Sequence, residues 1–306
     1  MDRSNITLER IRTFVRIAER GNLSAVARQM RTGQSTITRH LRELETALGI
    51  ALLSRTTRRV VLTDEGRTYY ASCVEILRLI DQAADDLRDT GEAVTGTVRL
   101  SCTAALGVLH VSRLVFEFQD LHPRIAIDLN LTDERIDLVG HGADLAIRLG
   151  PLVDSSLKLR PLGVSERLLV AAPAYLARRG QPHDPQALRF HETVRMSNVA
   201  GSDVLALTGP SGQVHAISVD GRLRVDHGLA AREAFLAGRG IGPSHRWLVD
   251  DVLADGRLQQ VLPEYRLAST PLSLLIVPER ATIARVRLVA DFLVDRLTRL
   301  PGISKS

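Results

Sequence analysis

Two runs decide the fold of this chain: Asn22-Leu-Ser-Ala-Val-Ala-Arg-Gln-Met30 and Gln34-Ser-Thr-Ile-Thr-Arg-His-Leu-Arg-Glu-Leu-Glu45, with Thr32-Gly33 between them. Their helical periodicity and the Thr-Gly break predict two helices joined by a tight turn. A short apolar and basic hairpin, Leu52 to Leu62, follows at once. Two helices across a tight turn with a basic ribbon behind them are typical of a winged helix-turn-helix, which presents one helix to the major groove of DNA.

The faces of the second helix, about Gln34 to Leu48, support this interpretation. One face is apolar and predicts burial; it carries Ile37, Leu41, Leu44 and Leu48. The opposite face is small, polar and basic; it carries Ser35, Thr38, Arg39 and Arg42. Such a face suits base edges and phosphates, although plain solvent exposure is the alternative for each residue.

Charge is distributed unevenly along the chain. The net charge is +5, yet residues 1–63 hold twelve Arg, no Lys and five acids, whereas the rest holds 28 bases and 30 acids. This asymmetry favours a polyanion as partner of the N-terminal region. An ordinary solvated surface is the alternative.

A long helix is expected after the hairpin. Thr63 is a candidate N-cap, and Asp64 and Glu65 suit a positive helix start. The helix should run to about Thr90 with apolar residues spaced by three or four: Tyr70, Val74, Leu77, Ile80, Ala84 and Leu87. We interpret these as a dimerisation seam; packing on the chain's own domain is the alternative.

The remainder of the chain alternates strand and helix patterns after a hinge at Gly91 to Gly96. Strands are expected at 98–102, 125–129 and 145–149, and helices at 106–120 and 134–140, which predicts an α/β lobe with a largely parallel sheet. A second lobe opens with a strand at 168–172. Its further elements are expected at 173–178, 214–218, 223–225, 227–238 and 272–277, and a last helix at 281–300.

Bulk properties narrow the class of protein. A length of 306 residues suggests two domains. The N-terminus lacks the apolar core of a signal peptide, and no apolar run approaches a membrane span. The two cysteines, Cys73 and Cys102, form neither a disulfide framework nor a zinc spacing, so we expect a cytoplasmic protein without membrane association.

Catalytic and cofactor patterns are weak. Gly238-Arg-Gly-Ile-Gly242 follows a predicted helix, which is the wrong context for a dinucleotide turn. His191-Glu192 lacks the second His of a zinc protease motif, and the nine His show no ligand spacing. Asp226-His227 could be an acid–base pair, but a cap or pocket role is the alternative. We therefore expect no catalytic residues, metal or cofactor; an unrecognised catalytic lobe, or a solute sensor without transcriptional output, stays as an alternative.

Taken together, these residues resemble the LysR-type transcriptional regulators over nearly the whole chain. The resemblance is carried by residues 14–28, Gln34 to Arg39, residues 44–53 and 55–66, and, in the C-terminal part, by 137–150, 168–177 and 291–293. It implies a multidomain chain of α+β and α/β parts: a winged helix-turn-helix, a dimerising linker helix and a two-lobed effector domain like type 2 periplasmic binding proteins. The expected division is residues 1–63, 64–95 and 96–306, with lobe I at 96–164 and 270–306 and lobe II at 165–269.

The resemblance also implies partners and DNA-reading positions. Such regulators are dimers or tetramers that bind double-stranded promoter DNA; RNA polymerase is a further candidate partner. Gln34, Ser35, Thr38 and Arg39 match the family's DNA-reading positions, and Arg58 matches its wing arginine, which can enter a narrow minor groove. With Arg42 on the same helix face, these residues are the expected DNA-binding set.

A small-molecule effector, an organic anion in our interpretation, is expected between the lobes. The expected contacts are Ser101, Thr103, Ser197, Asn198, His227 and His245. Helix starts after the first strands add free backbone amides, which suit an anion. Two departures from the family pattern bear on its identity. Ala105 stands where relatives often carry a hydroxyl, and it argues for a ligand other than the aromatic acids sensed by many relatives. Ser244-His245-Arg246 stands where relatives are apolar and is either tuned to an effector or surface variation. Arg148 is expected to pair with an acid such as Asp144, with ligand binding as the alternative.

Overall fold

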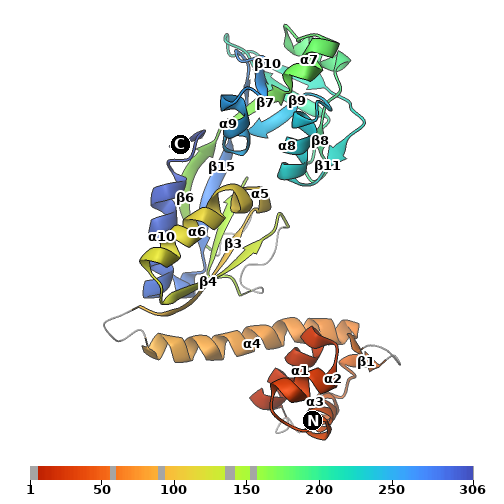
Figure 1. The fold of residues 1–306 in the computed structure, drawn as a ribbon, viewed down its shortest axis with the longest axis vertical. Helices are drawn as coiled ribbons and strands as arrows, with labels where there is room; N and C mark the ends of the chain where they lie inside the picture. Colours follow the sequence, from red (N-terminus) through yellow and green to blue (C-terminus); the bar gives the residue numbers. More distant parts are fainter. Residues whose placement is uncertain (1–5, 56–59, 89–93, 135–141, 152–156, 306) are drawn as a thin grey trace. The chain divides into compact units, whose positions relative to one another are not determined.

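The computed structural model describes residues 6–305 except 56–59, 89–93, 135–141 and 152–156. The described residues form two compact units, an N-terminal unit through helix α4 and a C-terminal unit from Val94 onward. Figure 1 shows both units. In the described part of the chain, no helix is long and apolar enough to cross a membrane.

The N-terminal unit is a winged helix-turn-helix followed by one long helix, as predicted. Its elements are α1 (Leu8–Arg20), α2 (Leu23–Gln29), α3 (Gln34–Leu48), β1 (Leu53–Arg55), β2 (Val60–Leu62) and α4 (Asp64–Arg88). Gly21 and Gly49 end α1 and α3 in the left-handed conformation, with φ of 62° and 73°. The two strands pair antiparallel, which makes the wing.

Two polar contacts and one glycine fix the wing against the helices. Glu45 Oε1 accepts hydrogen bonds from the amides of Leu52 and Leu53, at 2.8 and 3.2 Å. Thr63 Oγ1 caps α4 by accepting from the Gly66 amide at 2.9 Å. A Cβ at Gly66 would lie 1.9 Å from the Leu52 carbonyl oxygen, so this close approach requires glycine.

Helix α4 packs on its own unit through a face that the sequence interpretation assigned to a dimer seam. Tyr70 and Leu77 pack, with Tyr69, against the core of α1–α3, and Cys73 is fully buried there. At Tyr70 and Leu77 the chain's own core thus covers part of the predicted seam, which favours the alternative of packing within the unit. The side chains of Ala84 and Leu87 lie outside the described residues.

A different stripe of α4 is left uncovered within the unit. Ile76 and Leu79 keep 40% and 47% of their surface exposed, and Ser72 and Ala83 extend the same stripe at spacings of four, three and four residues. Residues at these spacings share one helix face. Val74, exposed by 39%, points elsewhere around the helix.

The C-terminal unit begins with lobe I, a six-stranded sheet in the order β16-β6-β15-β5-β3-β4. Strand β3 runs parallel to β4 and β5, whereas β15 is antiparallel to β5 and β6. Its strands are β3 (Gly96–Cys102), β4 (Ile125–Leu131), β5 (Leu145–Leu149), β6 (Lys158–Ser165), β15 (Thr270–Ile276) and β16 (Ile303–Ser304). Its helices are α5 (Ala104–Leu106), a π-helical turn η2 (Gly107–Val111), α6 (Ser112–Leu121), η4 (Pro278–Arg280) and α10 (Ala284–Leu297).

Lobe II follows β6 and returns through β15, so two chain crossings connect the lobes (Figure 1). Strand β7 (Arg167–Ala171) lies between β12 (Gly242–His245) and β13 (Gln259–Val261). The other strands are β8 (Arg195–Met196), β9 (Val204–Thr208), β10 (Val214–Ser218), β11 (Arg224–Val225) and β14 (Arg266–Leu267). The helices are α7 (Pro173–Arg179), η3 (Pro185–Phe190), α8 (Gly228–Leu236) and α9 (Arg246–Ala254).

Several predicted elements need correction. The expected helix 106–120 is three pieces, because the turn at Gly107–Val111 is π-helical. Strand β6 and helix α9 were not predicted at all. The expected helix 134–140 lies outside the described residues apart from its first residue, and so do residues 91–93 of the expected hinge.

The predicted pairing of Arg148 with Asp144 is wrong. Arg148 Nη2 instead donates to Ser101 Oγ at 2.7 Å. Asp144 is buried beside Arg280, with 3.6 Å between Oδ1 and Nε, and accepts from the Arg99 amide at 2.8 Å. Arg148 lies on β5, whereas Asp144 directly precedes that strand, so the two side chains meet different partners.

Candidate functional site

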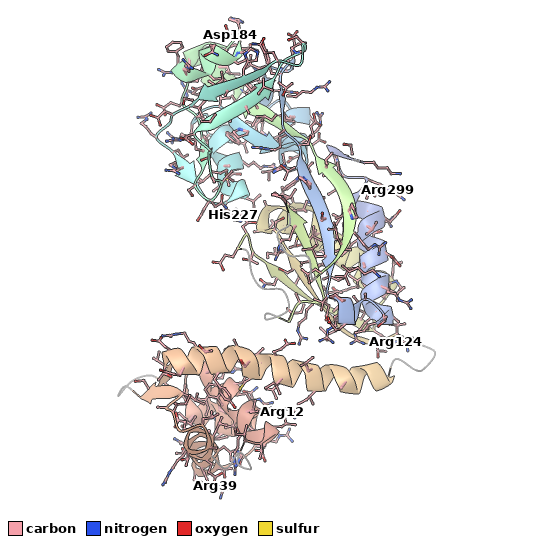
Figure 2. The ribbon with its side chains drawn as sticks, turned by 180° about the vertical axis from the view of Figure 1, so that it is seen from behind. Arg12, Arg39, Arg124, Asp184, His227 and Arg299 are labelled. Atoms are coloured by element: carbon pink, nitrogen blue, oxygen red, sulfur yellow. The ribbon has the colours of Figure 1, made fainter. Side chains whose placement is uncertain are left out.

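The outer face of α3 brings five of the predicted DNA-binding residues together. Gln34, Ser35, Thr38, Arg39 and Arg42 line one open hollow on this helix. All but Thr38 are exposed, and Thr38 is half-buried. Figure 2 shows Arg39 at the outer surface of the N-terminal unit. Arg58, the sixth predicted residue, lies outside the described residues.

Two hydrogen bonds hold side chains in place at the N-terminal end of this surface. Ser24 Oγ on α2 donates to Gln34 Oε1 at 3.0 Å, and Thr38 Oγ1 donates to the Gln34 carbonyl at 3.0 Å. With its oxygen held by Ser24, the Gln34 amide is ordered and keeps its NH2 donors for an acceptor. Ordered donors at a helix start are what recognition of base edges requires.

The acids of α3 do not offset its arginines. Glu43 forms an ion pair with Arg10 at 2.5 Å, and the Glu45 carboxylate holds the wing amides. These are the only two acids on α3. The hollow lined by Arg39 and Arg42 is consequently basic, a suitable surface for phosphates.

The second candidate site is a cavity of about 620 Å³ in the C-terminal unit. Its walls come from both lobes, with Thr103 and Asp133 from lobe I, and Asn198 and His245 from lobe II. A cavity of this size is typical of small-molecule sites. Three of the predicted effector residues line it: Thr103, Asn198 and His245.

The other three predicted effector residues do not line the cavity. Ser101 is 1% exposed and accepts from Arg148. Ser197 is exposed, and its amide pairs with the Val225 carbonyl. His227 caps α8, where its Nδ1 accepts from the Leu229 amide at 3.2 Å; Figure 2 marks its position at the edge of lobe II.

The start of α5 holds a carboxylate of the chain itself. Asp133 Oδ1 accepts from the Ala104 amide at 2.9 Å. Its second oxygen, Oδ2, lies 3.9 Å from His227 Nε2 of lobe II. Asp133 thus takes the position in which the sequence interpretation expected an effector anion, at the face of lobe I that approaches lobe II.

The two arginines in the cavity wall have different surroundings. Arg195 donates to the Gly221 carbonyl and to Asp220, both at 2.9 Å. Arg167 is half-buried at the start of β7 and has no ion pair or hydrogen bond to its side chain among the described residues. Burial lowers the pKa of Arg167, as expected for a cation that lacks a compensating acid.

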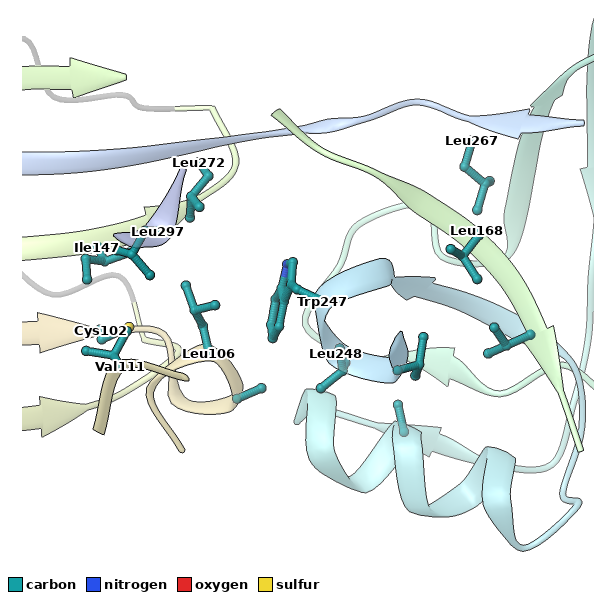
Figure 3. Packing of buried hydrophobic residues seen from close by; sticks show 14 of the residues in the cluster. Cys102, Leu106, Val111, Ile147, Leu168, Trp247, Leu248, Leu267, Leu272 and Leu297 are labelled. Carbon is teal, nitrogen blue, oxygen red and sulfur yellow. The ribbon is translucent and has the colours of Figure 1, made fainter. Parts of the chain in front are cut away.

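A hydrogen-bond network joins the lobes beside Arg167. Trp247 Nε1 donates to Ser165 Oγ at 3.0 Å, and Ser165 Oγ lies 2.8 Å from His245 Nδ1. The His245 ring stacks on Trp247 with 5.5 Å between centroids. Burial, and secondarily Arg167, lower the pKa of His245 to about 3, so the ring is neutral at pH 7. Figure 3 shows Trp247 between buried residues of the two lobes.

Sequence reasoning missed Arg167, Asp133 and Trp247 as cavity residues. A weak signal existed for Arg167, because this charged residue directly precedes the apolar run Leu168 to Ala172. Nothing in the sequence placed Asp133 against the start of α5, since that contact depends on the parallel pairing of β3 and β4.

The catalytic alternatives gain no support from the geometry. The Nδ1 of His227 is engaged as a helix cap, so Asp226-His227 is not arranged as an acid–base pair. Among the described residues, no group of three His, Cys, Asp or Glu side chains is placed to hold a metal ion. Burial raises the pKa of Cys102 to about 12, which leaves its thiol protonated and unreactive.

Comparisons with known proteins cover both units. A family described as "LysR substrate binding domain" matches residues 91–298, and "Bacterial regulatory helix-turn-helix protein, lysR family" matches residues 8–67. The HTH-type transcriptional regulator DmlR of Escherichia coli is 32% identical over 289 residues, which is 94% of this chain and 93% of DmlR.

Two solved structures resemble the whole chain. The structure of CrgA, a LysR-type transcriptional regulator from Neisseria meningitidis, is 28% identical with a TM-score of 0.62, and covers 94% of this chain and 98% of CrgA. The full-length virulence activator AphB of Vibrio cholerae is 26% identical with a TM-score of 0.66, and covers 95% of this chain and 99% of AphB.

Proposed function

The chain belongs to the LysR family of transcriptional regulators, and on that premise we propose that it reads promoter DNA with α3 under the control of a small molecule bound between the lobes. Members of this family are DNA-binding regulators with an effector-binding domain rather than enzymes. The proposal has three parts: the side chains that read DNA, the surface that dimerises and the cavity that holds the effector.

The observation that carries the DNA proposal is the basic hollow on α3. Arg39 and Arg42 supply charge for phosphates or guanine, and the Gln34 amide, ordered by Ser24, supplies donors for a base edge. The acids of the same helix are engaged by Arg10 and by the wing. Arg58, on the family's wing position, is proposed to contact the neighbouring minor groove.

Dimerisation is proposed through the exposed stripe of α4. Ile76 and Leu79, with Ser72 and Ala83, give an apolar strip whose burial against a second copy would be favourable. A two-fold dimer places two reading helices on half-sites roughly 34 Å apart or a multiple of it. The resemblance to the family further implies that dimers pair into tetramers.

The cavity is proposed as the effector site because both lobes contribute to its wall. A ligand that prefers one arrangement of the lobes shifts the protein toward that arrangement by its differential affinity. Coupling to DNA of about 1–3 kcal/mol is typical of such linkage. The expected setting is the cytoplasm, where RNA polymerase at the promoter is the expected protein partner.

The test of the DNA proposal is selection of genomic fragments by the full-length protein. We expect the retained fragments to share a sequence with two half-sites. The matched variant, Arg39→Ala with Arg42→Ala, should lose that enrichment while keeping its melting temperature, because both side chains are exposed. A wild type that retains fragments without any shared sequence would refute sequence-specific regulation.

A further inference from the structure

We propose that the effector is a monoanion with an apolar body, and that its anionic group binds Arg167 beside His245 rather than the start of α5, where Asp133 already stands in for a bound carboxylate. This inference rests on the proposed effector role of the cavity. It differs from the sequence-based expectation, which placed the anion at the hydroxyls and amides that follow the first strands and favoured a ligand other than an aromatic acid.

The first observation is that the helix-start position is filled. A free carboxylate bound there would need the Ala104 amide, which already donates to Asp133 at 2.9 Å. The Asp133 charge would also repel a second carboxylate at that distance. The neighbouring Thr103 hydroxyl is buried, lines the cavity and has no hydrogen-bond partner among the described residues, so it remains available to a neutral oxygen or nitrogen of the ligand.

The second observation is the imbalance of charge at Arg167. Of the two arginines in the wall, Arg195 is matched by Asp220, whereas Arg167 meets no acid among the described residues. Burying an unpaired charge is unfavourable, and proteins ordinarily pair it. The carboxylates of the wall, Asp133 and Asp226, do not pair with it, so an incoming anion would be its first counter-ion.

The third observation concerns the donor beside Arg167. His245 faces Arg167 across the β7–β12 pair. Ser165 is fully buried and accepts the indole hydrogen of Trp247, and in the arrangement that we propose its own hydrogen is directed at His245 Nδ1. The neutral ring then carries its proton on Nε2. Arg167 and His245 together present a cation and a neutral donor from adjacent strands, a combination suited to one carboxylate.

The rest of the wall defines the body of the ligand. Much of it is apolar; its aliphatic and aromatic members include Leu149, Met196, Leu205, Trp247, Leu248 and Leu267. One unmatched cation calls for one negative charge, and the acids Asp133 and Asp226 disfavour a second. Aromatic or branched aliphatic monocarboxylates satisfy these conditions in a cavity of about 620 Å³.

Trp247, the only tryptophan of the chain, lines the cavity and gives a direct readout of binding. The test titrates the full-length protein with three acid–amide pairs: benzoate and benzamide, 3-phenylpropionate and its amide, and 4-methylpentanoate and its amide. Tryptophan emission and calorimetry follow binding. We expect each acid to bind roughly 10- to 100-fold more tightly than its amide, because a charged hydrogen-bonded pair replaces a neutral one.

Variants locate the anion. Arg167→Met should abolish the preference for acids, and Arg167→Lys should retain part of it. Without ligand, Arg167→Met should melt no lower than the wild type, because it removes an unpaired buried charge. Asp133→Asn should keep the preference for acids, since Arg167 is intact. Equal binding of acid and amide by the wild type, or binding of neither, overturns the inference.

Two further outcomes also overturn it: an acid preference that survives Arg167→Met, or acid affinity that rises sharply in Asp133→Asn, which would place the anion at α5. Mobility shift with promoter DNA, run with and without the same acids, separates this inference from the proposed function. Acid binding that depends on Arg167 but leaves DNA binding unchanged would uphold the anion site and refute its regulatory role.

Discussion

At the scale of single residues, the pKa of His245 makes a testable link between the cavity and stability. Its folded pKa is about 3, below the ordinary value of 6.5, because the ring is buried and Arg167 is nearby. Between these two values the unfolded chain binds the proton and the folded chain does not. The stability that neutral His245 contributes is therefore fully present above the unfolded pKa of 6.5 and is lost progressively as pH falls from 6.5 toward 3.

We expect wild-type stability to fall between pH 7 and pH 5 with a contribution from His245 of up to about 1.4 kcal/mol per pH unit. His245→Gln keeps an acceptor for Ser165 but does not titrate, so its slope should be shallower. Urea unfolding of both proteins at the two pH values measures the difference. Identical slopes would mean that His245 is not held neutral by its surroundings.

The exposed arginines of α3 give a second residue-scale prediction. Arg39→Ala and Arg42→Ala should each weaken DNA binding, by ~1–3 kcal/mol for a base-edge contact, whereas loss of a phosphate contact should reduce the salt slope by about 1. Arg124→Ala removes an exposed arginine of the C-terminal unit and is the charge-matched control. Mobility shifts at two salt concentrations measure the affinity and its salt dependence. Equal affinity in the wild type and the three variants would reject α3 as the reading helix.

The placement of a side chain could be predicted from the sequence where the periodicity of a single helix determines the face on which it lies. The α3 face followed from spacing alone, because one helix fixes which side chains share a surface. The cavity wall did not: Ser101 precedes Thr103 by only two residues, yet it lies on β3, where it is buried and accepts from Arg148. Arg167 and Asp133 reach the cavity through strand pairings between distant segments, and a single sequence carries little signal for those.

At the scale of elements, α4 shows why an apolar period alone did not identify an interface. The helix has two apolar faces, one through Tyr70, Cys73 and Leu77 and one through Ile76 and Leu79. Both satisfy a spacing of three and four residues. Only the folded unit distinguishes them, because the core of α1–α3 covers the first face and leaves the second exposed.

This difference gives an element-scale prediction. Ile76→Glu with Leu79→Glu should place like charges across the two-fold seam and yield monomers with weakened DNA binding. Val74→Glu is the control, since Val74 is also exposed but belongs to the sequence-based seam. Light scattering at micromolar concentration measures both. Monomers from Val74→Glu with dimers from the double variant would restore the original seam.

Strand β6 and helix α9 were missed for another reason. The β6 sequence, Lys158-Leu-Arg-Pro-Leu-Gly-Val-Ser165, carries a Pro and a Gly that weaken its strand pattern. It forms because β15 and β16 pair with its two edges. No element was predicted over helix α9, although Trp247, Leu248 and Val249 are buried in it. In both cases tertiary packing decides what local preference leaves open.

At the scale of the whole molecule, each of the two units carries a different candidate site. The N-terminal unit carries the basic reading surface, and the C-terminal unit carries a cavity walled by both lobes. The family and its two-unit organisation could be predicted from the sequence because helix-turn-helix spacing, charge asymmetry and strand–helix alternation are all local. The chemistry of the effector could not, because it depends on which charges lack a partner in the folded lobes.

The central claim, that α3 reads a specific DNA sequence, is tested most directly by sequencing genomic fragments retained by the full-length protein. The account predicts one shared sequence with two half-sites whose centres lie a whole number of helical turns apart, ~34 Å or a multiple of it. It also predicts that the Arg39→Ala, Arg42→Ala double variant loses this enrichment. Fragments without a shared sequence, or the same enrichment in the double variant, would contradict it.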